Sequence, residues 1–174
     1  KGTYFLADTL INRHPDTETL IDIAKLSDKT VRFFNHTPVI SMLSYSNFGA
    51  DTAGSPVSVH EAVEYMQQNY PDLAIDGEMQ VNIAFDNDLM KENYPFSAVV
   101  DKNVNTLVFP NLHAANIGYQ LMHSLCRCEV IGPILLGMKR SVHILQLGSS
   151  VREIVNMVAI AVTDAQVKAK RKVG

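Results

Sequence analysis

The fold follows from residues 38–80, which read "PVISMLSYSNFGADTAGSPVSVHEAVEYMQQNYPDLAIDGEMQ". The apolar run at 38–44 is typical of a short buried strand, and a polar loop follows it. A helix is predicted to begin at Ser58, because Glu61 completes a capping box with it, and to end at a Tyr-Pro pair. A second strand is predicted at 72–80. Strand, helix and strand in this order indicate a parallel sheet covered by helices.

The same alternation continues along the rest of the chain. Further strands are predicted at 3–8, 104–110, 129–137 and 142–146. Further helices are predicted at 16–34, at 111–125 and from Ser150 onward, where Glu153 completes another capping box. The segment 87–97 is expected to be irregular. Together these elements predict an α/β fold with a mostly parallel sheet sandwiched by helices.

The last two predicted helices carry apolar residues at helical spacing. The stripes consist of Ile117, Leu121 and Leu125 in one helix and Val151, Ile154, Val155, Val158 and Val162 in the other. Such a stripe is typical of a helix that packs one face against the rest of the protein.

The composition is that of an ordinary globular protein. The chain has 174 residues, of which 47% are hydrophobic and 19% charged, and its net charge is -3. Because this charge gives no overall attraction to nucleic acid or an anionic membrane, neither is expected as a partner. No uncharged apolar stretch of 18 residues is present, so no transmembrane helix is predicted. The chain begins without methionine and already in a strand-like run, and we expect a cut inside a longer protein.

The cysteines are Cys126 and Cys128, and so low a number indicates a reducing cytoplasm. With His123 they give the spacing His-x-x-Cys-x-Cys, which is compatible with a metal site. Structural zinc sites have four ligands, and no fourth ligand here has a convincing spacing. We therefore expect two small buried residues at a helix end and no metal in this domain.

Polar residues gather in three loops that follow predicted strands, where parallel α/β sheets bind ligands. The loop 44–49 could bind phosphate, because small residues let backbone N–H groups approach an oxyanion. Alternatively, its serines and asparagine satisfy their own backbone. The loop 109–118 contains His113, which is either a general base or an ordinary loop histidine. The third loop, 143–150, has no nucleophile, acid or cation at its tip.

Two acids, Asp76 and Glu78, flank Gly77. In a strand, side chains two residues apart share a face, so this pair could bind a metal or hold a proton. The Asp-Gly pair is also a turn signal, and a turn with two solvated acids is the alternative.

The motifs "FLADTLIN", "LSYSNFG", "IDGEMQ", "FPNLHAANIGYQL", "IGPILLGM" and "SSVREIVNMVAIAV" resemble, in this order, the phosphate acetyl/butyryl transferase family. They cover nearly the whole chain. "LADT", "SNFG" and "HILQLG" resemble the branch fused to the C-terminus of NADP-dependent malic enzymes. The resemblance implies an isocitrate/isopropylmalate dehydrogenase-like fold of two α/β domains with a cleft between them. Residues 1–132 would form the second domain, and residues 133–174 would return toward the first.

The sequence differs from the family that it resembles in the segment before the last helix. Active members of the family carry Asp-Leu-Ser-Arg-Gly there, and their serine and arginine help acyl transfer from acetyl phosphate to coenzyme A. Here the segment is Ile144 to Gly148, with Gln146 in the serine position and Leu147 in the arginine position. The family's aspartate, which acts as a base for the thiol, is replaced by Glu153. Asn82 stands where an aspartate usually follows "GEMQ".

The resemblance implies a regulatory, homo-oligomeric, cytoplasmic domain that binds acetyl-CoA or a related acyl-CoA and has no catalytic residue of its own. The expected cleft residues are Ser44, Ser46, Asn47, Asn116, Gln146 and Gly148. NADP and Mg²⁺ or Mn²⁺ would belong to N-terminal malic enzyme domains outside this sequence, which would decarboxylate malate to pyruvate. Two alternatives stay open: an active phosphate acetyltransferase, and a purely structural dimerisation module.

Overall fold

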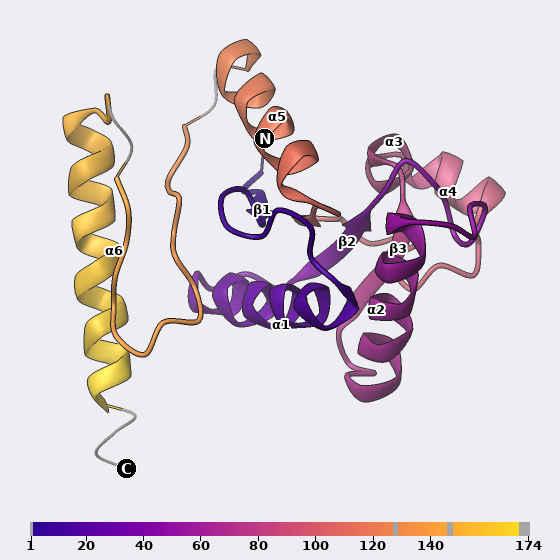
Figure 1. Ribbon diagram of the computed structural model, residues 1–174, viewed down its shortest axis with the longest axis horizontal. Coiled ribbons are helices and arrows are strands. Elements are labelled where there is room, and N and C mark those ends of the chain that lie inside the picture. The colour runs from indigo at the N-terminus through magenta and orange to yellow at the C-terminus, as the bar shows by residue number, and fades with distance from the viewer. Residues whose placement is uncertain (1, 127–128, 146–147, 171–174) are drawn as a thin grey trace. The chain divides into compact units, whose positions relative to one another are not determined.

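The structure is a computed structural model, shown in Figure 1, and it describes residues 2–126, 129–145 and 148–170. The chain divides into two compact units, Lys1–Tyr119 and Gln120–Gly174. The boundary that the resemblance places between residues 132 and 133 stays a prediction.

The described part of the first unit contains a parallel sheet of four strands in the order β1-β4-β2-β3 (Figure 1). The strands are β1 (Phe5–Ala7), β2 (Val39–Leu43), β3 (Ala74–Met79) and β4 (Thr106–Val108). Thr106 lies opposite both Phe5 and Ile40, and Val39 lies opposite Ala74. The prediction of a parallel sheet flanked by helices is therefore confirmed, although each strand is shorter than predicted.

Two apolar clusters cover the two faces of this sheet. The helices of the unit are α1 (Thr17–Phe33), α2 (Ser55–Asn69), α3 (Val81–Phe85), α4 (Asn87–Asn93) and the first half of α5 (Leu112–Leu125). Residues of α1 and α2 pack with Met42 in one cluster, whereas residues of α3 and α4 pack with Leu43 in the other. Because successive strand residues point to opposite faces, one short strand supplies both clusters.

A side chain caps the start of the first helix but not the start of the second. Asp16 caps α1 by accepting a hydrogen bond from the Thr19 backbone N–H at 2.9 Å. Helix α2 starts at Ser55 with a proline in its first turn, so the predicted start at Ser58 is wrong. The fixed backbone angle of proline suits the first turn of a helix, so the helix begins three residues before Ser58. Glu61 instead accepts a hydrogen bond from the Thr17 hydroxyl at 2.7 Å, on the neighbouring helix.

A short helix forms in a segment that was predicted to be irregular. The predicted irregular segment 87–97 contains α4, whose first turn is capped by Asp86 accepting from the Leu89 N–H at 2.9 Å. In α4 only Met90 is buried, so no helical periodicity of apolar residues was visible in the sequence. Lys91 also pairs with Asp101 at 2.7 Å, which ties this helix to the loop after it.

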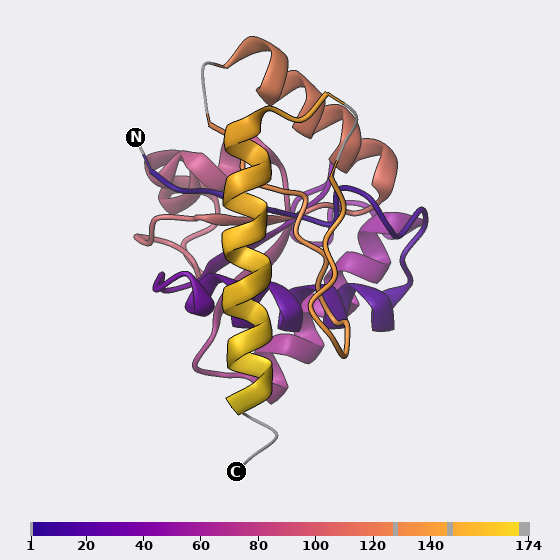
Figure 2. The same cartoon turned by 90° about the vertical axis from the view of Figure 1, so that its left-hand side faces the viewer.

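The second unit contains α6 (Val151–Lys170) and the extended segment that precedes it (Figure 2). The predicted capping box is confirmed, because the Ser150 N–H donates to Glu153 at 2.6 Å and the Glu153 N–H donates to the Ser150 hydroxyl at 3.3 Å. The Ser141 hydroxyl donates to the Ala161 carbonyl at 3.0 Å and holds the extended segment beside the helix.

The predicted strands at 129–137 and 142–146 are not formed in the described residues 129–145. A strand needs a neighbour that pairs with its backbone N–H and C=O groups, and within this unit the described segment runs along a helix instead. The prediction of two strands from these apolar runs is therefore wrong for the described residues.

The two predicted apolar stripes are exposed. Leu121 is 54% exposed in α5, and Val155 and Val158 are 61% and 56% exposed in α6, where Met157 is buried instead. The expectation that Cys126 is buried is also wrong, because it lies exposed just beyond the end of α5; Cys128 lies outside the described residues. Within the ranges that the structure describes, no helix is both long and apolar enough to cross a membrane.

Candidate functional site

The loop that follows β2 is polar, and it lies against the carboxyl end of β3. The Ser44 N–H donates to the Met79 carbonyl at 2.9 Å, and the Phe48 N–H donates to the Glu78 carbonyl at 2.8 Å. These contacts fold the loop over the next strand, at the edge of the sheet where parallel α/β proteins bind ligands.

A fully buried carboxylate, that of Glu78, lies under this loop. Its Oε1 accepts a hydrogen bond from the Ser46 hydroxyl at 3.0 Å and another from the Gly49 N–H at 2.7 Å. Its Oε2 lies 3.2 Å from Nδ1 of His60, on α2. A buried carboxylate is costly unless it is paired and hydrogen-bonded, and these three partners provide that compensation.

The side chains of the loop brace it further. The Ser46 hydroxyl also accepts from the Asp51 N–H at 3.0 Å. Asn47 Oδ1 accepts from the Gln80 N–H at 2.8 Å. The Tyr45 hydroxyl donates to Asp51 at 2.6 Å, which lowers the pKa of the Asp51 carboxyl and raises the pKa of Tyr45. The loop is therefore held in one shape by its own side chains and by β3.

Asp76 is buried as well, but it has a separate set of partners. It accepts hydrogen bonds from the Ser97 hydroxyl at 2.8 Å, the Ala98 N–H at 2.7 Å and the Gln67 side chain at 3.1 Å. The predicted turn with solvated acids is wrong, because residues 74–79 form the strand β3 and both carboxylates are buried. The two acids also share no hydrogen-bond partner among the described residues, so they do not act as one pair.

Gly77, between the two acids, is required by the packing of β2 against β3. Its φ is +147°, and a Cβ at this position would run into the backbone carbonyl of Met42. Only glycine permits both this backbone angle and this close approach.

The structure places the predicted cleft residues in different parts of the chain. Ser44, Ser46 and Asn47 come together in the loop after β2. Asn116 lies in α5, and its side chain makes no hydrogen bond to that loop among the described residues. Gly148 belongs to the second unit, where its φ is +88°. Gln146 and Leu147 lie outside the described residues. Whether these residues line one ligand site stays a prediction.

The candidate base His113 lies exposed near the start of α5, with its ring centroid 6.0 Å from that of His14. The start of the helix is capped by Asn111, which accepts from the Ala114 N–H at 3.0 Å. A buried carboxylate that the structure does place beside a histidine is that of Glu78, and its partner is His60, which also lies 3.7 Å from Glu64. The signal that could have found it is an acid inside an apolar strand run, since such an acid must be paired when it is buried.

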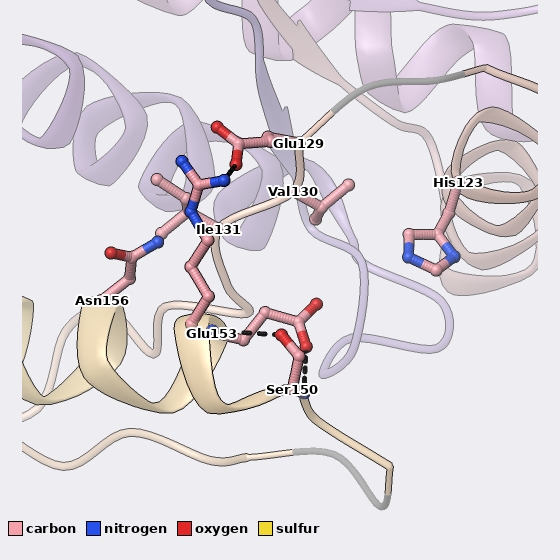
Figure 3. A pocket seen from close by; sticks show the side chains of 8 residues that line it. His123, Glu129, Val130, Ile131, Ser150, Glu153 and Asn156 are labelled. Atoms are coloured by element: carbon pink, nitrogen blue, oxygen red, sulfur yellow. Dashed lines mark hydrogen bonds and ion pairs between the residues drawn. The ribbon is translucent and has the colours of Figure 1, made fainter.

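In the second unit, a pocket of about 200 Å³ opens at the start of α6 (Figure 3). It is lined by His123, Glu129, Val130, Ile131, Ser150, Arg152, Glu153 and Asn156. Arg152 forms an ion pair with Glu129, and Ser150 and Glu153 cap the helix at its rim. The hydrogen bonds from Ser150 lower the pKa of the Glu153 carboxyl.

The comparisons with known proteins agree with this architecture. The family model described as phosphate acetyl/butaryl transferase matches residues 1–162. The chain is 40% identical over 166 residues to the NADP-dependent malic enzyme of Escherichia coli, which covers 95% of this chain and 22% of that protein. It is 39% identical over 167 residues to the phosphate acetyltransferase of Clostridium acetobutylicum, which covers 95% of this chain and 50% of that protein.

Among solved structures, a phosphotransacetylase from Streptococcus pyogenes matches with a TM-score of 0.86 at 38% identity, over 93% of this chain and 49% of that one. The EutD phosphotransacetylase from Staphylococcus aureus matches with a TM-score of 0.85 at 32% identity, over 95% of this chain and 52% of that one. The chain thus spans about half the length of these transacetylases and about a fifth of the malic enzyme. It belongs to the phosphate acetyl/butaryl transferase family.

Proposed function

We propose that this chain is a regulatory domain of an NADP-dependent malic enzyme, which binds acetyl-CoA or a related acyl-CoA without transferring its acyl group. The observation that carries the proposal is the hydrogen bonding of the Glu153 carboxylate. Its carboxylate caps α6 instead of standing free, and it follows a segment in which Gln146 and Leu147 replace the serine and arginine of active family members.

The missing serine and arginine matter because of the charge that acyl transfer creates. Attack of a thiolate on acetyl phosphate builds negative charge on the carbonyl oxygen while phosphate leaves. Fixed donors stabilise that charge, and removing one costs on the order of 10²–10³ in rate. An arginine also recognises phosphate through two parallel hydrogen bonds, which a leucine cannot make. With both groups replaced, little turnover is expected.

Glu153 is poorly suited to replace the family's base. Two hydrogen bonds involving Ser150 stabilise its ionised form, and they lower its pKa. A carboxylate with a lowered pKa is a weaker proton acceptor, so it takes a proton from a thiol less readily.

Binding does not need these catalytic groups. Coenzyme A has a long pantetheine arm and an adenine, which loops and apolar walls can hold. The braced loop at 44–51 supplies a polar surface that needs little ordering when a ligand arrives. A coupling of about 1–3 kcal/mol between this site and the malate site would suffice for regulation.

In this proposal, the decarboxylation of malate to pyruvate takes place in domains outside this chain. NADP and Mg²⁺ or Mn²⁺ would bind to the malic enzyme domains of a cytoplasmic homo-oligomer. Among residues 2–126, 129–145 and 148–170, no group of three or more His, Cys, Asp or Glu side chains is arranged to hold a metal ion.

A second candidate is an active phosphate acetyltransferase, which is favoured by the 39% identity to the enzyme from Clostridium acetobutylicum. Two measurements on the intact natural polypeptide separate the candidates. Calorimetry with acetyl-CoA is expected to give saturable binding, and a coupled assay with acetyl phosphate and CoA is expected to show no turnover above background. Healthy turnover would overturn the proposal in favour of the enzyme.

The third possibility, a purely structural module, is decided by deletion of residues 1–174 from the intact polypeptide. If the domain is regulatory, the deletion abolishes the response of malate decarboxylation to acetyl-CoA. If it is only a dimerisation module, the oligomer size changes while the response to acetyl-CoA persists.

A further inference from the structure

Two hydrogen-bond donors of the loop at 44–51 point inward, to the buried side chain of Glu78. The N–H of Gly49 and the hydroxyl of Ser46 both donate to the carboxylate of Glu78, at 2.7 and 3.0 Å, and the N–H of Phe48 donates to its backbone carbonyl at 2.8 Å. A phosphate-binding loop directs such donors toward its ligand. Here the protein's own carboxylate takes them, so the shape of the loop depends on Glu78.

The side-chain amide of Asn47 offers a further hydrogen-bond donor group in this loop. The side-chain oxygen of Asn47 accepts from the Gln80 N–H at 2.8 Å, which fixes which end of the amide points toward β3. The Nδ2 group of Asn47 makes no hydrogen bond among the described residues, and the residue is half-buried. Its two N–H bonds are therefore free to serve a hydrogen-bond acceptor that is not part of this chain.

We infer that Glu78 is a positioning residue of the ligand site, and that it holds the loop so that the Asn47 amide is presented as a donor to an acceptor group of the acyl-CoA, such as a phosphoryl oxygen. This inference rests on the proposed function, because the ligand it names is that of the proposed site. Glu78 is fully buried beneath the loop and need not touch the ligand itself.

The chain contains a matched control for Glu78. Asp76 lies two residues earlier on the same strand and is also a buried, hydrogen-bonded carboxylate. Its partners are Gln67, Ser97, Ala98 and Gly77, none of which belongs to the loop. A variant of Asp76 therefore removes a buried carboxylate from β3 and leaves the loop contacts intact.

The first test compares acetyl-CoA binding by calorimetry in variants of the intact polypeptide. Glu78→Met removes the acceptor of the buried Ser46 hydroxyl and of the Gly49 N–H, and we expect the Kd to rise by about tenfold or more. Glu78→Gln keeps one oxygen that accepts these bonds, and it is expected to recover most of the affinity. Asp76→Leu is expected to lower the melting temperature by a similar amount to Glu78→Met, with a Kd within about threefold of wild type. Equal losses of affinity in Glu78→Met and Asp76→Leu would overturn the inference.

The second test uses Asn47→Asp. This change keeps an oxygen for the Gln80 N–H, and it replaces the donor with a negatively charged oxygen. We expect an unchanged melting temperature and a Kd raised by about tenfold, because a carboxylate repels an anionic acceptor. An unchanged Kd in this variant would show that the amide does not face the ligand.

Amide hydrogen exchange separates failure of this inference from failure of the proposed function. If wild-type protein binds no acetyl-CoA, the proposed function fails. The exchange of the Phe48–Ala50 amides then decides whether Glu78 holds the loop. These amides should exchange at least about tenfold faster in Glu78→Met, and also in the milder Ser46→Ala, but not in Asp76→Leu. Unchanged exchange in the first two variants would overturn the inference by itself.

Discussion

Ser150 and Glu153 cap the last helix reciprocally: the Ser150 N–H donates to the Glu153 carboxylate at 2.6 Å, and the Glu153 N–H donates to the Ser150 hydroxyl at 3.3 Å (Figure 3). The Glu153 carboxylate thus has a structural role at the start of α6.

Replacing Ser150 with alanine removes the hydroxyl of the capping box. We expect a loss of about 1 kcal/mol in the free energy of unfolding, because one N–H at the start of α6 loses its partner. Chemical denaturation followed by circular dichroism measures this loss. Thr163→Ala is the control, since Thr163 is an exposed residue in the same helix whose hydroxyl bonds only to the Ala159 carbonyl. Equal effects of the two substitutions would contradict a capping role for Ser150.

Asp16 makes the stability of α1 depend on pH. Hydrogen bonds from Thr19 hold the pKa of its carboxyl below the ordinary value. A group whose pKa is lowered on folding stabilises the protein above its unfolded pKa, and this contribution disappears as the pH falls through the folded pKa. We expect Asp16→Asn, which can still cap the helix, to lose less stability than wild type between about pH 5 and pH 2. Thermal melts across this range test the difference, and parallel pH curves would contradict it.

Gly77→Ala is expected to destabilise the first unit strongly, by about 3 kcal/mol or more. The new methyl group would meet the Met42 backbone carbonyl, and alanine disfavours a φ of +147°. Gly49→Ala is the matched control, because its φ is also positive, at +83°, but no atom lies within 4 Å of the added carbon. Denaturant unfolding should therefore show a clearly larger loss for Gly77. A similar loss at both positions would mean that the backbone angle alone matters.

Two adjacent positions in α6 test the exposure of its apolar stripe. Met157 is 4% exposed and Val158 is 56% exposed. In the 174-residue chain, Met157→Ser is expected to cost about 2 kcal/mol or more, whereas Val158→Ser should stay within about 0.5 kcal/mol of wild type. Denaturant unfolding compares the two variants. A large loss at Val158 would show that the stripe is covered in solution.

Restoring the serine and the arginine that the resemblance to the family leads us to expect tests the proposal that this chain transfers no acyl group. The double substitution Gln146→Ser and Leu147→Arg in the intact polypeptide should raise the rate of acetyl-CoA formation from acetyl phosphate by at least about tenfold, since one donor alone carries on the order of 10²–10³ in rate. Each single variant serves as a control and is expected to gain less. If the double variant stays at the background rate, these two positions are not what limits the chemistry.

The alternation of strand and helix, the capping box of α6 and the family were all predictable from the sequence. These features are local or follow from short motifs: a run of apolar residues has the period of its element, and Ser150 and Glu153 are three residues apart. The strands predicted at 129–137 and 142–146 failed for the opposite reason. A strand forms only when a distant segment pairs with it, and local apolar content carries no information about that partner.

The candidate site, too, was only partly predictable from the sequence. The sequence alone marked the loop after β2 as polar and placed Asp76 and Glu78 next to each other. Only the tertiary structure decided that both acids are buried, that they serve different partners, and that Glu78 joins β3 to Ser46, Gly49 and His60. These partners lie 18 to 32 positions away in the chain. Burial makes each contact obligatory, because a buried carboxylate needs hydrogen-bond partners, but the folded backbone selects which partners are within reach.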